Sequence, residues 1–144
     1  MLRGWARVDL GEVEAGLADL RNSIRGLETS GTLIMMQFAH YHLACALVAS
    51  GQLEPALELV EQILAEVGAS GGRWYEAEIH RLKGDIFRMQ GKSVSETEPH
   101  YEAAIAVAKR QGARAWELRA AESLDALRKR DAFAPRANTT LNLS

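Results

Sequence analysis

The sequence predicts an all-α protein, a short stack of antiparallel helix pairs with about seven helices. The first observation is composition, because alanine, leucine, glutamate and arginine dominate the 144 residues and favour helix. The second is an even interval, because glycines recur every forty residues at Gly11, Gly51 and Gly91. A repeat of this length is typical of stacked helix–turn–helix units. The third is that no segment alternates with period two or gathers β-branched residues, so we expect no strands.

The first helix of each unit carries a small residue seven positions before its glycine. These small residues are Gly4, Ala44 and Gly84. A glycine inside a helix costs up to ~1 kcal/mol of helix propensity, so we expect it where a neighbouring helix approaches closely. The glycine that follows suits a turn or a helix C-cap with a positive φ. The pattern therefore marks the packing point and the end of each first helix.

Proline marks the start of the second helix in two units. Pro55 and Pro99 are tolerated near a helix start, where the missing N–H has no partner to lose. The connector before Pro99 is four residues longer than the one before Pro55. We expect Ser93 or Ser95 in this connector to cap the helix.

The apolar periodicity predicts the bounds of the helices. In the second helix of two units it matches position by position, so that Leu57 corresponds to Tyr101. The expected helices span residues 2–10, 12–29, 33–50, 53–67, 73–90, 95–111 and 114–130. They form one repeat domain over residues 1–131, with repeats at about 1–31, 32–71 and 72–112 and a capping helix at 113–131. Residues 132–144 have no apolar stripe, and we expect a flexible tail.

Composition and charge exclude several classes of protein. The net charge of −2 gives no overall basic field for nucleic acid. One cysteine, Cys45, allows no internal disulfide and no multi-cysteine zinc site. The nearly uncharged stretch from Thr32 to Gln52 contains several polar residues, which indicates a buried helix rather than a membrane span. Met1 to Gly4 lack the apolar core of a signal peptide. We expect a cytoplasmic protein without a cofactor and without a nucleic-acid or membrane partner.

The turn pattern of the middle units resembles a known family. Residues 44–56 and residues 84–91 resemble the tetratricopeptide repeat, in one of its longer bacterial variants. The pattern departs from the family consensus at His40 and His80, where an aromatic residue is usual, and at Lys83, where leucine is usual.

Two longer stretches, residues 73–84 and 104–121, are similar to the C-terminal repeat region of large bacterial regulators. In those proteins a nucleotidyl cyclase or a DNA-binding domain is joined to a signal-transduction ATPase and then to a helical repeat array. The resemblance covers residues 40–130 and implies a right-handed superhelical stack within a larger signalling protein. No cyclase metal-binding aspartates and no phosphate-binding glycine loop can be matched, so neither activity is expected.

The resemblance also implies a binding surface, because the first helices of such arrays line a concave face. In one unit the corresponding residues form an apolar set: Phe38, Tyr41, Cys45 and Val48. In the next unit they form a charged set: Glu78, Arg81, Asp85 and Arg88. We expect the apolar set to bury a side chain of a bound peptide and the charged set to pair with its charges. The chain is therefore expected to be a non-catalytic regulatory module that binds a protein or peptide.

Two other functions remain open. The first unit lacks most of its leading helix and the last lacks its second, so helix faces exposed at the two ends also suit self-association as a homodimer. A small-ligand sensor domain is the other alternative.

An enzyme or a metal protein has little support. His40 and His42 lie two apart on a helix and point to different faces, so they do not chelate a metal together. His80 shares the repeat position of His40, which favours a packing role for both. Cys45 has no partner at a catalytic spacing and is typical of a buried small hydrophobic residue.

Four carboxylates are candidates for acid–base chemistry: Glu76, Glu78, Asp85 and Glu117. However, Glu78, Arg81 and Asp85 fall at i, i+3 and i+7, which is typical of a salt-bridged and solvated helix face. Trp74 and Trp116 are expected to cover the second helix of the preceding unit. The basic run at residues 128–130 is expected to compensate the dipole at a helix C-terminus.

Overall fold

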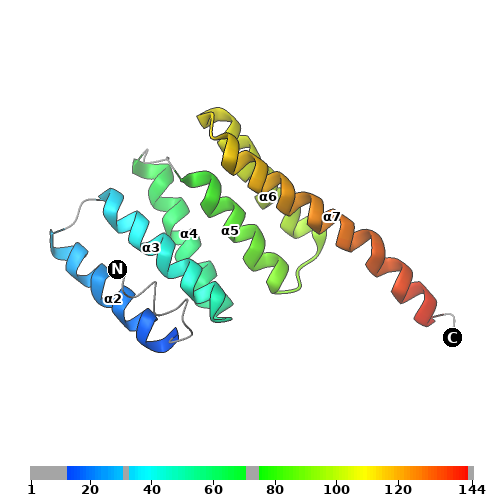
Figure 1. The fold of residues 1–144 in the computed structure, drawn as a ribbon, viewed down its shortest axis with the longest axis horizontal. Helices are drawn as coiled ribbons and strands as arrows, with labels where there is room; N and C mark the ends of the chain where they lie inside the picture. The colour runs from blue at the N-terminus through cyan, green and yellow to red at the C-terminus, as the bar shows by residue number, and fades with distance from the viewer. Residues whose placement is uncertain (1–12, 31–32, 71–74, 143–144) are drawn as a thin grey trace. The chain divides into compact units, whose positions relative to one another are not determined.

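The computed structural model describes residues 13–30, 33–70 and 75–142, and in these ranges the chain forms helices and no strand (Figure 1). This confirms the all-α fold class. The described part contains six helices rather than the seven expected, and the helix expected at 2–10 lies, with Gly4 and Gly11, outside it. The helices are α2 (Val13–Ser30), α3 (Leu33–Ala49), α4 (Leu53–Ser70), α5 (Glu76–Met89), α6 (Val94–Gln111) and α7 (Arg114–Asn142).

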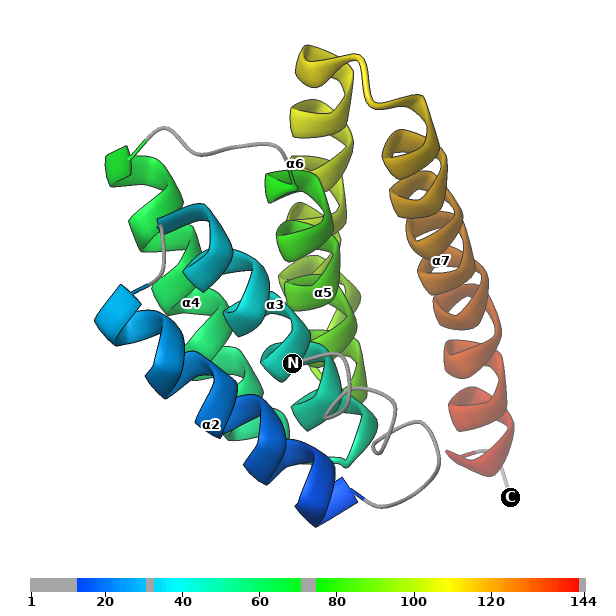
Figure 2. The ribbon, with the colours of Figure 1, turned by 60° about the vertical axis from the view of Figure 1, so that its left-hand side comes forward.

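The chain divides into two compact units, Met1–Arg73 and Trp74–Ser144. In the first unit α3 packs against both α2 and α4 (Figures 1 and 2). Burial of their facing apolar side chains is the main favourable contribution to the stability of such a unit. The large core side chains described in this unit are Leu17, Leu20, Ile24, Leu43, Leu47, Val60, Ile63 and Val67.

In the second unit α6 packs against α5 and α7, and α5 also contacts α7. Trp116, at the start of α7, packs against a cluster of Ala77, Val107 and Ala108. This confirms that Trp116 covers the preceding second helix, whereas Trp74 lies outside the described residues. The other large core side chains described in this unit are Tyr75, Ile79, Leu82, Ile86, Tyr101, Leu124 and Leu127.

Two of the evenly spaced glycines form the turns that the sequence predicts. Gly51 follows α3 with a φ of 79°, and Gly91 follows α5 with a φ of 76°. At the first turn the Gln52 N–H donates to the Leu47 carbonyl at 2.9 Å, which closes the end of α3. A side chain at either glycine would strain this left-handed backbone. The interval of forty residues therefore reflects the conformation of the turns.

The bounds of α6 are set by two caps. Ser93, rather than Ser95, is the N-cap: its hydroxyl accepts from the Glu96 N–H at 3.3 Å, and Glu96 Oε2 accepts from the Ser93 N–H at 3.0 Å. Gly112 closes the helix with a φ of 67°. Pro99 is the sixth residue of α6, deeper than we expect from a helix-start proline, and it lies on the exposed side of the helix.

Replacing Ser93 by alanine is expected to lower the unfolding free energy by ~1 kcal/mol, because one capping bond is lost. The bonds from Ser93 also hold the pKa of Glu96 below its ordinary 4.5, with the backbone N–H as the larger cause. The pKa of Glu96 should therefore rise only part of the way to 4.5 in Ser93→Ala, measured by NMR titration. Ser95→Ala is the matched control, and an equal loss of stability in both variants would contradict the cap.

The last helix is longer than the sequence predicts. α7 continues to Asn142 through most of the segment expected to be a flexible tail. Extending an existing helix needs no new nucleation, which offsets the poor helix propensity of Pro135 and the two threonines in this segment. The basic run at residues 128–130 consequently lies inside the helix, so its expected role at a helix C-terminus is wrong. Arg128 instead reaches α6, where its Nε donates to Glu98 Oε1 at 2.9 Å.

Candidate functional site

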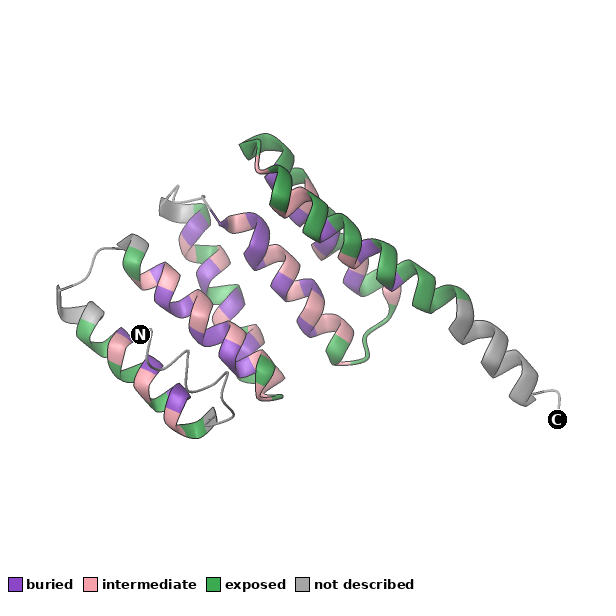
Figure 3. Cartoon of the chain, in the orientation of Figure 1, coloured by how far each residue is buried: buried purple, intermediate pink, exposed green. Residues whose placement is uncertain are grey.

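The apolar set predicted on α3 lies along one side of that helix. Phe38, Tyr41, Cys45 and Val48 are all half-buried within the first unit, and the helix shows this mixed burial along its length (Figure 3). Their spacing of three or four residues places them on one face. Met35 precedes them by three residues and is 44% exposed. We call these five residues the α3 stripe. No charged side chain occurs in α3, so the stripe is apolar apart from its tyrosine hydroxyl and thiol.

The charged set predicted on α5 forms a contiguous salt-bridged face. The Arg81 guanidinium donates to both carboxylate oxygens of Glu78, at 3.2 and 3.0 Å, and to Asp85 at 2.9 Å. The expectation that this face is solvated is wrong at Glu78, which is only 4% exposed. Glu78 is buried because α7 packs over it, and Arg119 of α7 lies 3.2 Å from the Glu78 carboxylate.

Tyr101 joins this face to α6. Its side chain is fully buried, and its hydroxyl donates to Asp85 Oδ1 at 2.6 Å. Burial raises the pKa of Tyr101, and the bond to Asp85 raises it further, while Arg88 opposes the shift. The hydroxyl therefore stays protonated and keeps donating at physiological pH. We call Glu78, Arg81, Asp85, Tyr101 and Arg119 the α5 cluster.

Gly84 is the point at which α6 approaches α5. A β-carbon at this position would stand 2.6 Å from Tyr101 Cε1 and 2.8 Å from Cδ1. Such distances are well inside van der Waals contact, so only glycine fits while the ring stays in place. This confirms, for the unit in which it can be examined, the expectation that the small residue permits a close approach.

Gly84→Ala is expected to lower the unfolding free energy by about 1–2 kcal/mol, because overpacking against a buried ring outweighs the gain in helix propensity. Gly68→Ala is the matched control. Gly68 is also helical, and nothing lies within 4 Å of a β-carbon there, so this variant should gain up to ~1 kcal/mol. Urea denaturation of both variants measures the difference, and a stabilising effect of Gly84→Ala would refute the packing argument.

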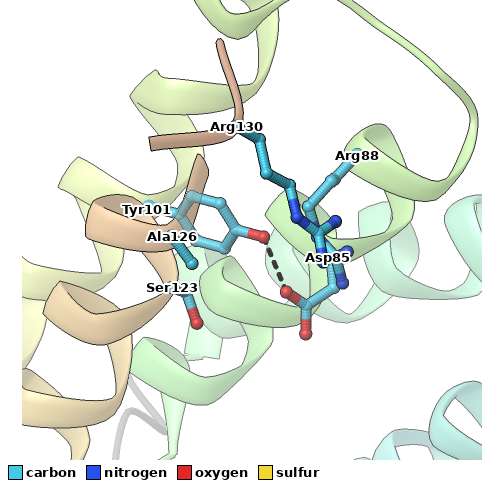
Figure 4. Close-up of a pocket in the computed structure, with 6 residues that line it drawn as sticks. All are labelled: Asp85, Arg88, Tyr101, Ser123, Ala126 and Arg130. Carbon is cyan, nitrogen blue, oxygen red and sulfur yellow. Dashed lines mark hydrogen bonds between the residues drawn. The ribbon is translucent and has the colours of Figure 1, made fainter. Parts of the chain in front are cut away.

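A pocket of about 180 Å³ opens beside the Tyr101–Asp85 bond (Figure 4). It lies among the three helices of the second unit, α5, α6 and α7. Two guanidinium groups project toward the bonded pair, Arg88 from α5 and Arg130 from α7 (Figure 4). Ser123 and Ala126 of α7 complete the wall. Two residues of the predicted charged set, Asp85 and Arg88, thus line a concave site.

The histidines do not converge on a metal site. His42 packs edge-on against Phe38 with ring centroids 4.3 Å apart, and His80 lies 3.7 Å from the Glu76 carboxylate. His40 is buried, and its Nδ1 has no hydrogen-bond partner among the described residues. Within the part of the chain that the structure describes, no group of three or more histidine, cysteine or acidic side chains is placed to hold a metal ion.

The four carboxylates considered for acid–base chemistry are each paired with a basic group. Glu78 and Asp85 share Arg81, Glu117 lies 3.7 Å from Arg114, and Glu76 lies beside a histidine. Cys45 is half-buried rather than fully buried.

Acidification is expected to destabilise the protein through two histidines. Burial lowers the pKa of both His42 and His80 below 6.5, and for His80 it outweighs the opposing effect of Glu76. The stability held by the neutral rings is present above pH 6.5 and is lost as the pH falls toward the folded-state pKa, because the unfolded chain protonates first. The urea concentration at the unfolding midpoint should decrease as the pH is lowered from 7 to 5. The dependence of this midpoint on pH should be weaker in His80→Gln. An unchanged dependence would contradict the role assigned to His80.

Sequence reasoning missed two residues of the α5 cluster, Tyr101 and Arg119, and three residues of the pocket wall, Ser123, Ala126 and Arg130. Tyr101 is the eighth residue of α6, as Val60 is of α4, and both are fully buried, whereas Leu57, the expected counterpart, is half-buried. The signal for Tyr101 was therefore the apolar periodicity counted from the start of the helix rather than from the proline. Arg119 and Arg130 carry no such signal, because only the packing of α7 brings them to α5.

The fold and site define a protein of packed helical hairpins with a polar pocket. Comparison with known proteins does not narrow this class to a family. The chain is 25% identical over 124 residues to an uncharacterized protein of Rhizobium meliloti (strain 1021). The alignment spans 86% of this chain but only 12% of that protein. No family model and no solved structure matches the chain. None of the described helices is long and apolar enough to cross a membrane.

Proposed function

We propose that the chain is a non-catalytic, tetratricopeptide-like module that binds a protein or peptide partner and has a regulatory role. The observation that carries this proposal is the α3 stripe, a row of half-exposed apolar side chains on a helix without charges. Apolar and aromatic side chains in a partly desolvated row are the usual anchors of peptide recognition. In this proposal the stripe buries a side chain of the partner, and no bond is made or broken.

The repeat geometry within each unit supports the tetratricopeptide-like part of the proposal. Each unit joins helices through a tight turn with a glycine of positive φ, at Gly51 and at Gly91. The Gly84–Tyr101 contact supplies the close approach of paired helices that such repeats require. We infer that the pairs belong to a right-handed superhelical stack in the intact protein.

The length of the relative supports a place in a larger bacterial protein, for which we propose a role in signalling. The chain spans about an eighth of a Rhizobium meliloti protein. A repeat array attached to other domains acts by holding partners near those domains. We further propose a cytoplasmic location, with a peptide segment or another domain as the target.

The proposal is tested by selecting binders from a random peptide library displayed on phage, with the full chain as bait. Peptides selected in this way should lose at least tenfold in affinity for Phe38→Ala and for Tyr41→Ala, measured by fluorescence anisotropy. Leu118→Ala is the matched control, because Leu118 is a 48% exposed apolar side chain on α7, outside the stripe. Circular dichroism verifies that each variant is folded.

Two outcomes would count against the proposal. Failure to enrich any peptide would contradict peptide recognition, and equal affinity of all variants would remove the α3 stripe as the site.

Self-association is tested on the same samples by light scattering over a concentration range. Most positions of α7 as far as residue 132 are exposed (Figure 3). Most of these exposed residues are charged or small, which suits a solvated cap better than a dimer face.

A further inference from the structure

We propose that the pocket in the second unit binds a phosphate-type oxyanion between Arg88 and Arg130. This goes beyond the peptide-binding function, because it assigns a separate small-ligand site. It rests on the charge balance of the α5 cluster, on the positions of the two guanidinium groups, and on the size of the pocket.

The charge balance leaves two positive charges at the pocket. The α5 cluster holds two carboxylates, Glu78 and Asp85, and these are met by Arg81 and by Arg119. Among the described residues, no carboxylate lies within ion-pairing distance of Arg88 or Arg130. Two guanidinium groups at one small pocket repel each other unless an anion lies between them. The pocket therefore has a net charge that matches a dianion.

The hydrogen-bonding capacity of the wall points to the same class of ligand. The Tyr101 hydroxyl already donates to Asp85, and the Ser123 hydroxyl donates to the Arg119 carbonyl at 3.1 Å. The donors that remain for a ligand are the guanidinium N–H groups. Their planar forks match the spacing of two oxygens on a phosphoryl group. Asp85 accepts from Tyr101 and from Arg81, and it lies beyond ion-pairing distance of Arg88 and Arg130.

The geometry also favours a compact ligand. The pocket of about 180 Å³ is open to solvent on one side, where Arg130 is exposed. A phosphoryl group fits this space, while a nucleotide would extend out of it. The two arginines come from different helices, so a bound anion would link α5 to α7 and stabilise the second unit against unfolding.

The test titrates inorganic phosphate into the full chain at constant ionic strength, with chloride as the replaced anion. We expect a saturable rise in Tm and a measurable heat of binding by calorimetry. Arg130→Gln should weaken binding at least tenfold, and so should Arg88→Gln. Arg88→Lys keeps the positive charge but loses the planar fork of the guanidinium. Its phosphate affinity should lie between that of the unaltered chain and that of Arg88→Gln. Arg130 is exposed, so its variant is expected to fold even if changes at Arg88 disturb packing.

A matched control accompanies these variants. Arg114→Gln removes a 76% exposed arginine from the same helix as Arg130, outside the pocket. It should bind phosphate as the unaltered chain does. A parallel titration with phenyl phosphate distinguishes the sources: tighter binding of the ester indicates a phosphoryl group carried on a larger molecule, and equal binding indicates the free anion.

The proposal is overturned if neither phosphate compound gives a saturable shift, or if Arg130→Gln binds as tightly as the unaltered chain. Because no peptide is present in this experiment, its failure leaves the α3 stripe untouched. Conversely, failure of the peptide selection leaves the anion site untouched.

Discussion

Tyr101→Ala is expected to lower the unfolding free energy by about 3–5 kcal/mol, the largest effect of any single substitution that we predict. The ring is fully buried and packs with Leu124 and Leu127 of α7, while its Cδ1 and Cε1 atoms lie against Gly84 of α5. Truncation removes these contacts together and leaves a cavity where three helices meet. Urea denaturation followed by circular dichroism measures the loss.

Tyr101→Phe separates the hydroxyl from the ring. It keeps the packing but takes a donor from Asp85, and the expected cost is about 1–3 kcal/mol. Thermal unfolding of the two variants should therefore rank alanine well below phenylalanine. Equal losses would mean that the bond to Asp85, rather than the ring, accounts for the stability. The double variant Gly84→Ala with Tyr101→Leu should lose less unfolding free energy than the two single variants lose together, because the clash with the ring disappears.

Glu78→Ala is expected to be the second largest effect, at about 2–3 kcal/mol. Glu78 is nearly inaccessible and receives bonds from Arg81 of its own helix and from Arg119 of α7. Removing one partner of such a pair leaves a desolvated charge, although the partial exposure of Arg81 reduces the penalty. The loss should be measurable by urea denaturation and should shrink in the double variant with Arg81→Met, which removes the stranded charge.

Asp125→Asn is the matched control for this prediction. It breaks the pair of Asp125 with Lys129 at 2.9 Å, in which both side chains are more than half exposed. An exposed pair of this kind contributes about 0–1 kcal/mol. If both substitutions cost the same, burial does not distinguish the two ion pairs and the role assigned to Glu78 is wrong.

The local features of the fold were predictable from the sequence. The six described helices begin within three residues of their expected starts, because apolar periodicity, capping serines and turn glycines act over a few neighbouring residues. Gly51 and Gly91 illustrate this, since a positive φ is a property of the turn alone. The end of α7 was mispredicted, because the segment lacks an apolar stripe yet extends a helix that already exists.

The site was predictable only in part. The spacing of Glu78, Arg81 and Asp85 predicted their mutual ion pairs, since neighbours on one helix face meet whatever surrounds them. Their burial, the bond from Tyr101 sixteen residues away, and the two guanidinium groups at the pocket were not predictable in the same way. These depend on how α6 and α7 pack against α5. The sequence thus accounts for the helices, the turns and the charged face of α5, and packing turns that face into a partly buried cluster beside a pocket, because contacts between helices depend on side chains that lie far apart along the chain.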